Sequence, residues 1–206
     1  MVQKEKNEPK KRGRPRGYDP AIALKRAAES FWKAGYAGTS LDDLSAATGM
    51  NRPSLYAAFG DKRDLYMRTL EYYRDESRAL ILTTLADKPP LKLFLKRFYD
   101  KALDIYLDEG PRGCYSIGTA ATVAAVDDDV RAFLAESMRT TDAFLKHQIE
   151  KAKARGEIAA DSDPAALAYL ATATLHTLAV RSRAGSPRKE LDALVKAAIK
   201  VICGPA

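Results

Sequence analysis

The sequence is poor in the residues that carry most metal and redox chemistry. Its 206 residues include only two cysteines, Cys114 and Cys203, and two histidines, His147 and His176, at no recognisable ligand spacing. We therefore expect no disulfide framework, no metal site and no cofactor. No run of about 18 apolar residues is present, and the charged N-terminus lacks the apolar segment of a signal peptide. These absences predict a cytoplasmic protein that does not contact a membrane.

Signatures of catalysis are missing as well. The sequence contains no nucleophile elbow, no phosphate-binding glycine loop and no pair of metal ligands. An enzyme needs a nucleophile, a base and an orienting group, or a metal cluster, brought together at one place. We therefore expect a protein that is not an enzyme.

Positive charge is present, but it is concentrated at one end. The formal net charge is +7, and residues 1–17 hold seven Lys or Arg against two Glu, which leaves only +2 for the rest. This segment has no apolar periodicity, so we expect a disordered basic arm. Its sequence RGRPR, with Arg12, Arg14 and Arg16, resembles the core of AT-hook peptides, which lie in narrow minor grooves. The alternative is a generic tail that only attracts phosphates.

Residues 37–60 show the pattern of two short helices joined by a tight turn. An apolar residue recurs every third position from Leu41, and Gly49 can end the first helix in a left-handed conformation. Asn51 can cap a second helix, and Pro53 falls in its first turn, where a missing N–H does no harm. This pattern predicts a helix-turn-helix unit, whose second helix enters the DNA major groove.

Helical signals continue on both sides of this unit. Asp-Pro and Ser-Pro pairs beginning at Asp19, Asp163 and Ser186 are typical helix starts. No segment alternates apolar and polar residues over a sustained length, as a strand would. The sequence therefore predicts an all-α fold of about nine helices.

The stretch GYAGTSLDDLSAATGMNRPSLYAAFGDKRDLY, from Gly35 to Tyr66, resembles the DNA-binding domain of the TetR family of transcriptional regulators. The residues that carry the resemblance in register are Gly35, Tyr36, Thr39, Ser40, Leu44, Ala46, Ala47, Gly49, Leu55, Tyr56, Phe59, Gly60, Lys62 and Leu65. The resemblance implies a three-helix DNA-binding domain over residues 18–66 and a helical effector-binding and dimerisation domain over residues 67–206. It also implies a repressor that a small molecule releases from a palindromic operator in double-stranded DNA.

Candidates for DNA contacts cluster around the two short helices. Arg52 is the first candidate for a base contact, because a guanidinium can donate two bonds to guanine. The resemblance implies phosphate contacts from Tyr56 and Lys62, and a core position is the alternative for Tyr56. Thr39 and Ser40 suit a phosphate at a helix N-terminus. The full set is Arg12, Arg14, Arg16, Tyr36, Thr39, Ser40, Asn51, Arg52, Pro53, Ser54, Tyr56 and Lys62.

Two stripes of small and apolar residues near the C-terminus suggest contact with a second copy of the chain. The resemblance implies that two helices from each subunit form a four-helix bundle. The alternative is that the same stripes pack into the chain's own core. The stripes contain Ala168, Ala171, Thr172, Leu175, Leu178, Leu191, Leu194, Val195 and Ala198.

The resemblance also implies a small-molecule effector among the C-terminal helices. Pockets for small molecules are lined mainly by apolar and aromatic side chains, so a plain core position is the alternative for each candidate. The candidates are Phe94, Phe98, Tyr106, Cys114, Tyr115, Met138, Phe144 and His176.

Two other functions remain open. Cys114 follows a Gly-Pro-Arg-Gly loop and could open a helix whose dipole lowers the thiol pKa, which would suit a sensor of electrophiles or oxidants. The alternative is an inert buried thiol. The basic arm would also suit a less specific architectural protein, which would coat DNA uniformly and protect no single palindrome.

Overall fold

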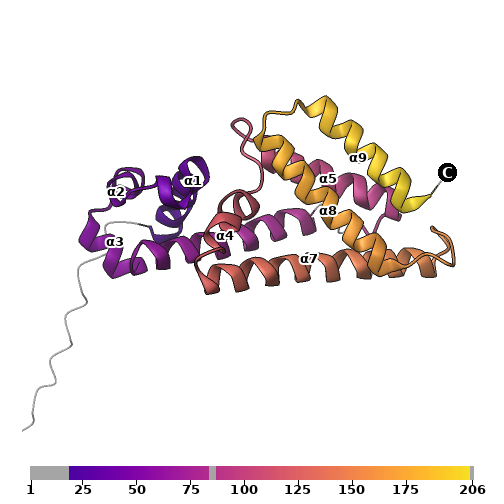
Figure 1. Ribbon diagram of the computed structural model, residues 1–206, viewed down its shortest axis with the longest axis horizontal. Helices are drawn as coiled ribbons and strands as arrows, with labels where there is room; N and C mark the ends of the chain where they lie inside the picture. The colour runs from indigo at the N-terminus through magenta and orange to yellow at the C-terminus, as the bar shows by residue number, and fades with distance from the viewer. Residues whose placement is uncertain (1–18, 84–86, 205–206) are drawn as a thin grey trace, which may run out of the picture.

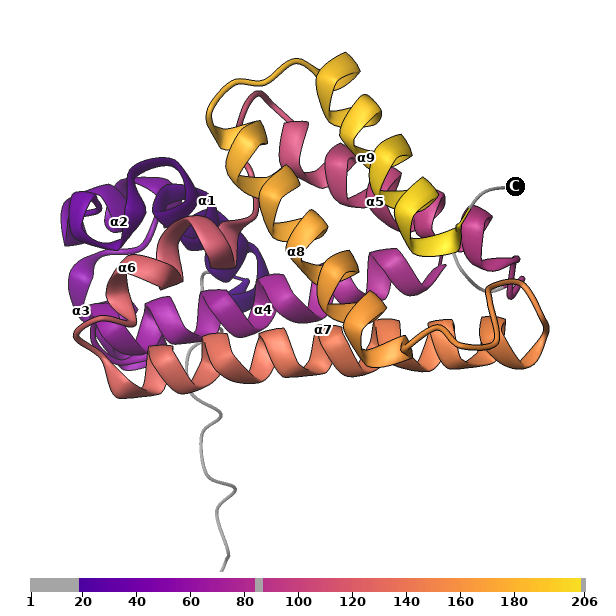
Figure 2. The same ribbon diagram turned by 45° about the vertical axis from the view of Figure 1, so that its right-hand side comes forward.

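A computed structural model describes residues 19–83 and 87–204 of the chain. Within these residues there are nine α-helices and one π-helix and no strand, which confirms the predicted all-α fold. Figure 1 shows α1, α2 and α3 gathered at one end of an elongated molecule, and α5, α8 and α9 at the other. The two long helices α4 and α7 run side by side along the molecule in both views (Figure 2).

The first three helices are α1 (Pro20–Gly38), α2 (Leu41–Thr48) and α3 (Arg52–Phe59). Each of them has a side-chain cap at its N-terminus, as predicted for Asp19 and Asn51. The Asp19 carboxylate accepts a hydrogen bond from an amide of α1, Ser40 forms a capping box with Asp43, and Asn51 accepts from the third residue of α3. Gly49 ends α2 at φ 72°, in the left-handed region that glycine tolerates best. Local sequence therefore determines where each helix of this unit begins or ends.

The remaining elements are α4 (Lys62–Thr83), α5 (Leu91–Leu107), the π-helix η1 (Ser116–Ala120), α6 (Ala121–Val123), α7 (Asp128–Ala154), α8 (Pro164–Arg183) and α9 (Arg188–Cys203). Asp127 caps α7, and Asp163 caps α8 beside a proline in the first turn. Between the long helices α5 and α7, the chain forms the π-helix η1 and the short helix α6.

The buried core has two parts, one at each end of the molecule. The part around α1, α2 and α3 includes Phe31, Trp32 and Tyr66, and it continues into Tyr115 and the first turns of α7 at Val130. The other part lies among α5, α7, α8 and α9. The core of the helix-turn-helix end therefore includes side chains from well beyond residue 66.

Candidate DNA-binding surface and effector cavity

The outer face of α3 is made by a polar N-terminus and one tyrosine. Leu55 and Phe59 are buried and hold α3 against its neighbours. Tyr56 is 46% exposed, so its ring is not a core element. Arg52 is exposed and is held by Asp42 of α2, with its Nε 3.0 Å from Oδ1 and an Nη 2.6 Å from Oδ2. The Asp42 carboxylate therefore fixes the direction of the guanidinium in the free protein.

The other predicted DNA contacts differ in how accessible they are. Lys62 lies over the Tyr36 ring, with Nζ 4.5 Å from the ring centroid. Ser40 is exposed, but its hydroxyl donates to Asp43 at 2.6 Å. Thr39 is only 1% exposed, and its hydroxyl donates to the Gly35 carbonyl at 2.7 Å.

The Thr39 side chain therefore serves the turn between α1 and α2. A phosphate at the N-terminus of α2 stays a prediction, and it depends on the backbone amides there. Asn51, Pro53 and Ser54 all lie at the N-terminus of α3, where the Asn51 side chain accepts from the Ser54 amide at 2.9 Å. The predicted contacts Arg12, Arg14 and Arg16 lie outside the described residues.

A closed set of buried hydrogen bonds joins α4 to the segment that starts η1. The Tyr66 hydroxyl donates to Thr119 Oγ1 at 2.8 Å, and Thr119 donates to the Tyr115 carbonyl at 2.9 Å. Thr69 donates to the Tyr66 carbonyl at 2.6 Å, so its oxygen, 2.7 Å from the Tyr115 hydroxyl, accepts from that hydroxyl. Burial raises the pKa of Tyr66 to about 12, and it raises the pKa of Tyr115 as well. Both phenols therefore stay protonated donors.

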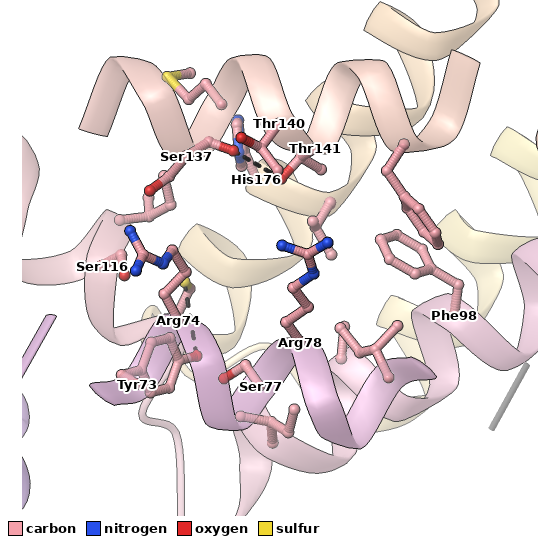
Figure 3. Close-up of a pocket in the computed structure, with 18 of the residues that line it drawn as sticks. Tyr73, Arg74, Ser77, Arg78, Phe98, Ser116, Ser137, Thr140, Thr141 and His176 are labelled. Carbon is pink, nitrogen blue, oxygen red and sulfur yellow. Dashed lines mark hydrogen bonds between the residues drawn. The ribbon is translucent and has the colours of Figure 1, made fainter. Parts of the chain in front are cut away.

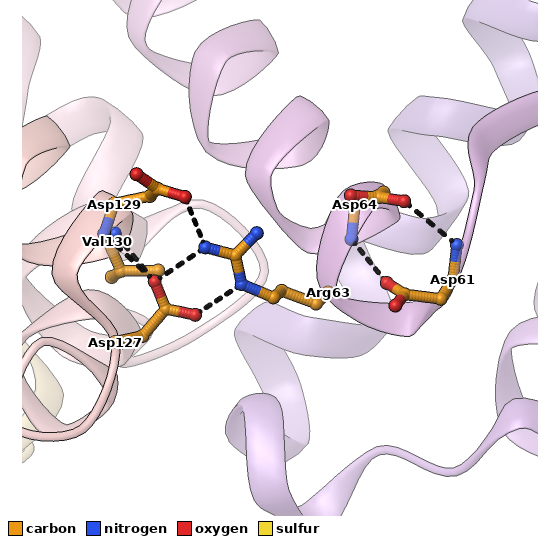
Figure 4. A network of polar contacts seen from close by, with 6 residues as sticks. All are labelled: Asp61, Arg63, Asp64, Asp127, Asp129 and Val130. Atoms are coloured by element: carbon orange, nitrogen blue, oxygen red, sulfur yellow. Dashed lines mark hydrogen bonds and ion pairs between the residues drawn. The ribbon is translucent and has the colours of Figure 1, made fainter.

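A second connection is ionic and links the start of α4 to the start of α7 (Figure 4). Arg63 donates to Asp127 at 2.5 and 2.9 Å and to Asp129 at 2.5 Å. The same Asp127 carboxylate caps α7 through the Val130 amide. The pKa of Asp127 is lowered to about 2. The largest cause is the hydrogen bond from the Arg63 guanidinium, and the next is the hydrogen bond from the Val130 amide. One carboxylate thus serves both a helix cap and a contact between elements.

A third connection surrounds the loop before Cys114. The Trp32 indole donates to the Arg112 carbonyl at 3.1 Å, and the Arg112 guanidinium lies 4.0 Å from the Trp32 ring centroid and pairs with Glu29. Arg183 of α8 donates to the same Arg112 carbonyl at 3.2 Å. The loop therefore links α1 to α8. The roles of Arg63 and Arg112 were not predicted, because their partners are 64 or more positions away in the sequence.

A cavity of about 210 Å³ lies among α4, α5, η1, α7 and α8 (Figure 3). Six of the eight predicted effector residues line it: Phe98, Tyr106, Cys114, Met138, Phe144 and His176. Phe94 does not line it and is buried in the core, stacked on Phe98 with ring centroids 6.2 Å apart. Tyr115 is fully buried in the hydrogen-bond network with Thr69 and Thr119, so it does not line the cavity.

The polar part of the cavity wall was not predicted. Arg74, Ser77 and Arg78 come from α4, and Ser137 and Thr141 come from α7. The sequence around the arginines, YYRDESR, is strongly charged and indicates a solvated helix face. Burial lowers the pKa of His176, an effect that Asp142 partly opposes, so the imidazole is neutral near pH 7.

Cys114 has an environment that opposes ionisation. The Tyr73 hydroxyl donates to its Sγ over 3.7 Å. Burial raises the pKa of the thiol, although hydrogen bonds from the start of η1 act in the other direction. This environment favours the alternative of an inert thiol over a thiolate at a helix start, because burial disfavours the charged form more than the backbone amides favour it.

The two predicted dimer stripes fall mostly inside the chain. Six of their residues, Ala168, Ala171, Thr172, Leu178, Leu191 and Val195, are buried in the chain's own core. Leu175, Leu194 and Ala198 are half-buried. The six buried residues pack in the chain's own core and leave no surface for a second subunit. For these positions the structure agrees with the alternative of an intrachain core. The outer faces of α8 and α9 instead present Tyr169, Val180 and Val201, which are 65%, 59% and 66% exposed.

Two kinds of site are not found in the part of the chain that the structure describes. No helix there is both long and apolar enough to cross a membrane. No three His, Cys, Asp or Glu side chains there come together as metal ligands could.

Two family models match the chain. One is described as bacterial regulatory proteins of the tetR family and matches residues 23–69. The other is described as the tetracyclin repressor-like C-terminal domain and matches residues 94–198. Together they cover both the helix-turn-helix end and the helices around the cavity.

Known proteins are similar over most of the chain. The HTH-type transcriptional regulator YezE of Bacillus subtilis is 34% identical over 159 residues, which are 76% of this chain and 81% of YezE. The HTH-type transcriptional repressor ComR of Escherichia coli is 29% identical over 184 residues, which are 88% of each chain.

A solved structure agrees with this. It contains a cysteine mutant of the TetR family transcriptional regulator CifR complexed with 26-bp double-strand operator DNA. It is 31% identical to this chain, covers 91% of this chain and 98% of its own, and has a TM-score of 0.83. The protein described here therefore belongs to the TetR family of bacterial transcriptional regulators and is a DNA-binding regulator rather than an enzyme.

Proposed function

We propose that the protein is a cytoplasmic repressor that binds a palindromic operator as a homodimer and leaves it when a small molecule enters the cavity. The observation that carries this proposal is the course of α4. Its first turns pack into the core of the helix-turn-helix end, and its later turns line the cavity. A ligand that binds one position of α4 better than another changes the affinity for DNA by at most that difference in binding free energy, provided that DNA prefers the other position.

Similar proteins support the repressor part of this proposal. Two relatives from Escherichia coli, ComR and BdcR, are named transcriptional repressors. BdcR is 33% identical over 102 residues, which are 50% of this chain and 51% of BdcR. We accordingly divide the chain into an arm at residues 1–17, a DNA-binding domain at 18–66, and an effector-binding and dimerisation domain at 67–206.

The dimer proposal rests on an apolar surface that has no partner within the described part of the chain. α8 is apolar on both sides: Ala171 and Leu178 face the core, whereas Tyr169 and Val180 face outward. Val201 of α9 is exposed as well. A second copy packed on this face would form a four-helix bundle. Such a dimer places the two α3 helices for half-sites about 34–36 Å apart, or a multiple of this.

The proposed division of labour in DNA binding follows from charge. Residues 18–66 hold six cations and six anions, whereas residues 1–17 carry +5. We therefore assign much of the attraction to phosphates to the arm and base reading to Arg52. Deleting residues 1–16 should weaken operator binding and reduce its salt dependence, by about 0.9 in log–log slope for each phosphate that the arm would otherwise neutralise. An unchanged slope would contradict this assignment.

The test of the proposed function is operator selection with the purified full-length protein, followed by footprinting and by measurement of the mass in solution. A protected palindrome and a dimer at micromolar concentration are expected. Uniform protection along the DNA would instead indicate an architectural protein. A monomer that still protects the palindrome would disprove the proposed dimer, but the proposed function as a sequence-specific regulator would stand.

A further inference from the structure

Two arginines of α4 extend into the cavity from one side. Arg74 and Arg78 are one helical turn apart, and Figure 3 shows both guanidinium groups reaching from α4 toward Ser137, Thr140, Thr141 and His176. Like charges at this spacing repel each other along a helix. Both residues are exposed, so solvent reaches them, but an anion in the cavity would meet two cations at once.

The described residues bring few acidic groups to these two cations. The Arg78 side chain makes no hydrogen bond or ion pair within residues 19–83 and 87–204. The Arg74 side chain pairs with the adjacent Asp75, which is itself exposed, and lies 5.3 Å from the Phe133 ring centroid. At longer range its charge also helps to lower the pKa of Glu136, after the hydrogen bonds from Arg139 and Thr140. None of the residues that line the cavity is an Asp or a Glu. The wall therefore carries two positive charges and no negative one.

The hydroxyls on the opposite wall do not compete with the arginines as donors. Ser137 donates its proton to the Phe133 carbonyl at 2.8 Å, and Thr141 donates to the Ser137 carbonyl at 2.9 Å. Each hydroxyl has one proton, so toward the cavity these oxygens offer only lone pairs. The His176 imidazole is neutral near pH 7, because burial lowers its pKa. The guanidinium groups are therefore the main cationic donors that a ligand in this cavity would meet.

The rest of the wall is apolar and gives the cavity two unlike ends. Phe98 lies on the far side of Arg78 from Arg74 in Figure 3. Its ring centroid is 6.4 Å from that of Phe144, and Ile81 and Leu175 also line the cavity. A ligand with one charged end and one apolar end matches this arrangement, because the charge meets the arginines while the apolar body leaves water.

We propose that the cavity binds a small organic monocarboxylate, with its carboxylate held by Arg78 and Arg74 and its apolar body against Phe98 and Phe144. The planar fork of a guanidinium matches the two oxygens of a carboxylate. The volume of about 210 Å³ suits a short alkyl chain or a single ring as the body. The role of such an anion as the molecule that releases DNA rests on the proposed function, but its binding does not.

The test titrates the DNA-free, full-length protein with benzoate and hexanoate, and with the neutral benzamide and hexanamide, by calorimetry. The two carboxylates should bind at least about tenfold more tightly than the amides of the same shape. Arg78→Gln should weaken carboxylate binding by about ten- to a hundredfold, the range expected when hydrogen bonds to a charged group are removed. Arg78→Lys keeps the charge without the fork and should give an intermediate loss.

The matched control is Arg97→Gln. Arg97 lies on α5 next to Phe98, but it pairs with Asp87, and neither of the two lines the cavity, so carboxylate affinity should not change. Benzenesulfonate separates charge from shape: it should bind more weakly than benzoate if the carboxylate geometry matters. Equal binding of amides and carboxylates, full affinity in Arg78→Gln, or no binding of either carboxylate would overturn the proposal.

Operator binding is measured separately, on the same protein without ligand. A protein that binds its operator but neither carboxylate disproves the anion site and leaves the regulator intact. A protein that binds benzoate through Arg78 but selects no operator disproves the proposed function and leaves the anion site intact.

Discussion

In the first half of α4, residues 62–70, four side chains are buried, whereas no side chain between residues 71 and 83 is. The first half holds the Tyr66–Thr119 and Thr69–Tyr115 hydrogen bonds and the Arg63 ion pairs. The second half presents Arg74 and Arg78 to a cavity. The first half of α4 is thus fixed by buried contacts to the helix-turn-helix end, whereas its second half has no fully buried side chain and lines the cavity. Regions with few buried contacts open and move at low cost, and elements that respond to ligands are drawn from them.

The largest expected effect separates the two halves by stability. Tyr66→Ala removes a fully buried ring and should lower the free energy of unfolding by about 3–5 kcal/mol, as other buried aromatic truncations do. Leu80→Ala, in the exposed half, should change it by less than about 0.5 kcal/mol. Chemical denaturation of both variants measures the difference. Similar losses from the two would mean that the halves are equally anchored.

A matched pair of threonines sharpens the comparison. Thr69→Val leaves the buried Tyr115 hydroxyl without an acceptor and should destabilise the protein by about 1–3 kcal/mol. Thr83 also donates to a backbone carbonyl, that of Leu80 at 2.7 Å, but it is exposed, so Thr83→Val should be close to neutral. Thermal melting of the two variants provides the measurement. A neutral Thr69→Val would show that the closed set of hydrogen bonds contributes nothing.

The ionic connection should appear as pH dependence. Because the folded pKa of Asp127, about 2, lies below its ordinary value, the stability linked to this group is present above about pH 4 and is lost as the pH falls toward 2. Arg63→Gln should raise the pKa of Asp127 and reduce this acid-dependent loss. Nuclear magnetic resonance titration of the Asp127 carboxyl measures the shift directly.

The control for this titration is Arg131→Gln. Arg131 pairs with the exposed Asp128 at the same helix start, so removing it should leave the Asp127 titration nearly unchanged. An Asp127 pKa that stays at about 2 in Arg63→Gln would mean that the α7 amides alone lower it.

The smallest expected effect belongs to the open half. Arg78→Gln removes one of two like charges at i and i+4, so the ligand-free protein should be unchanged or more stable by about 0.2–0.5 kcal/mol. Denaturation under low salt measures this. A destabilisation above about 1 kcal/mol would assign Arg78 a structural role and weaken the contrast between the halves.

The parts of the molecule that sequence predicted are those governed by local chemistry. Asp19, Asn51 and Asp163 act as caps at the helix starts that the sequence indicated, since a cap bonds to amides within three residues. Gly49 ends α2 for a reason equally local. Helix bounds in the helix-turn-helix unit could therefore be derived before the fold was known.

The parts that sequence did not predict depend on which elements meet. Nothing near Arg63 indicates Asp127, because the two come together only when the start of α4 meets the start of α7 in the fold. Arg74 and Arg78 have the pattern of a solvated face and both remain exposed, and only the arrangement of α5, α7 and α8 around them makes them part of a cavity wall. The apolar stripe that includes Ala171 has the same helical periodicity whether it packs in the chain's own core or against a second subunit. Only the burial of these side chains in the folded chain distinguishes the two arrangements.

Hydrogen exchange along α4 tests the central claim most directly. In the free protein, amides of residues 66–70 should exchange only through nearly global unfolding, whereas those of residues 74–83 should exchange through local opening and become protected on addition of benzoate. Uniform protection along α4, unaffected by benzoate, would contradict a helix that is fixed at its DNA-binding end and responsive at its other end.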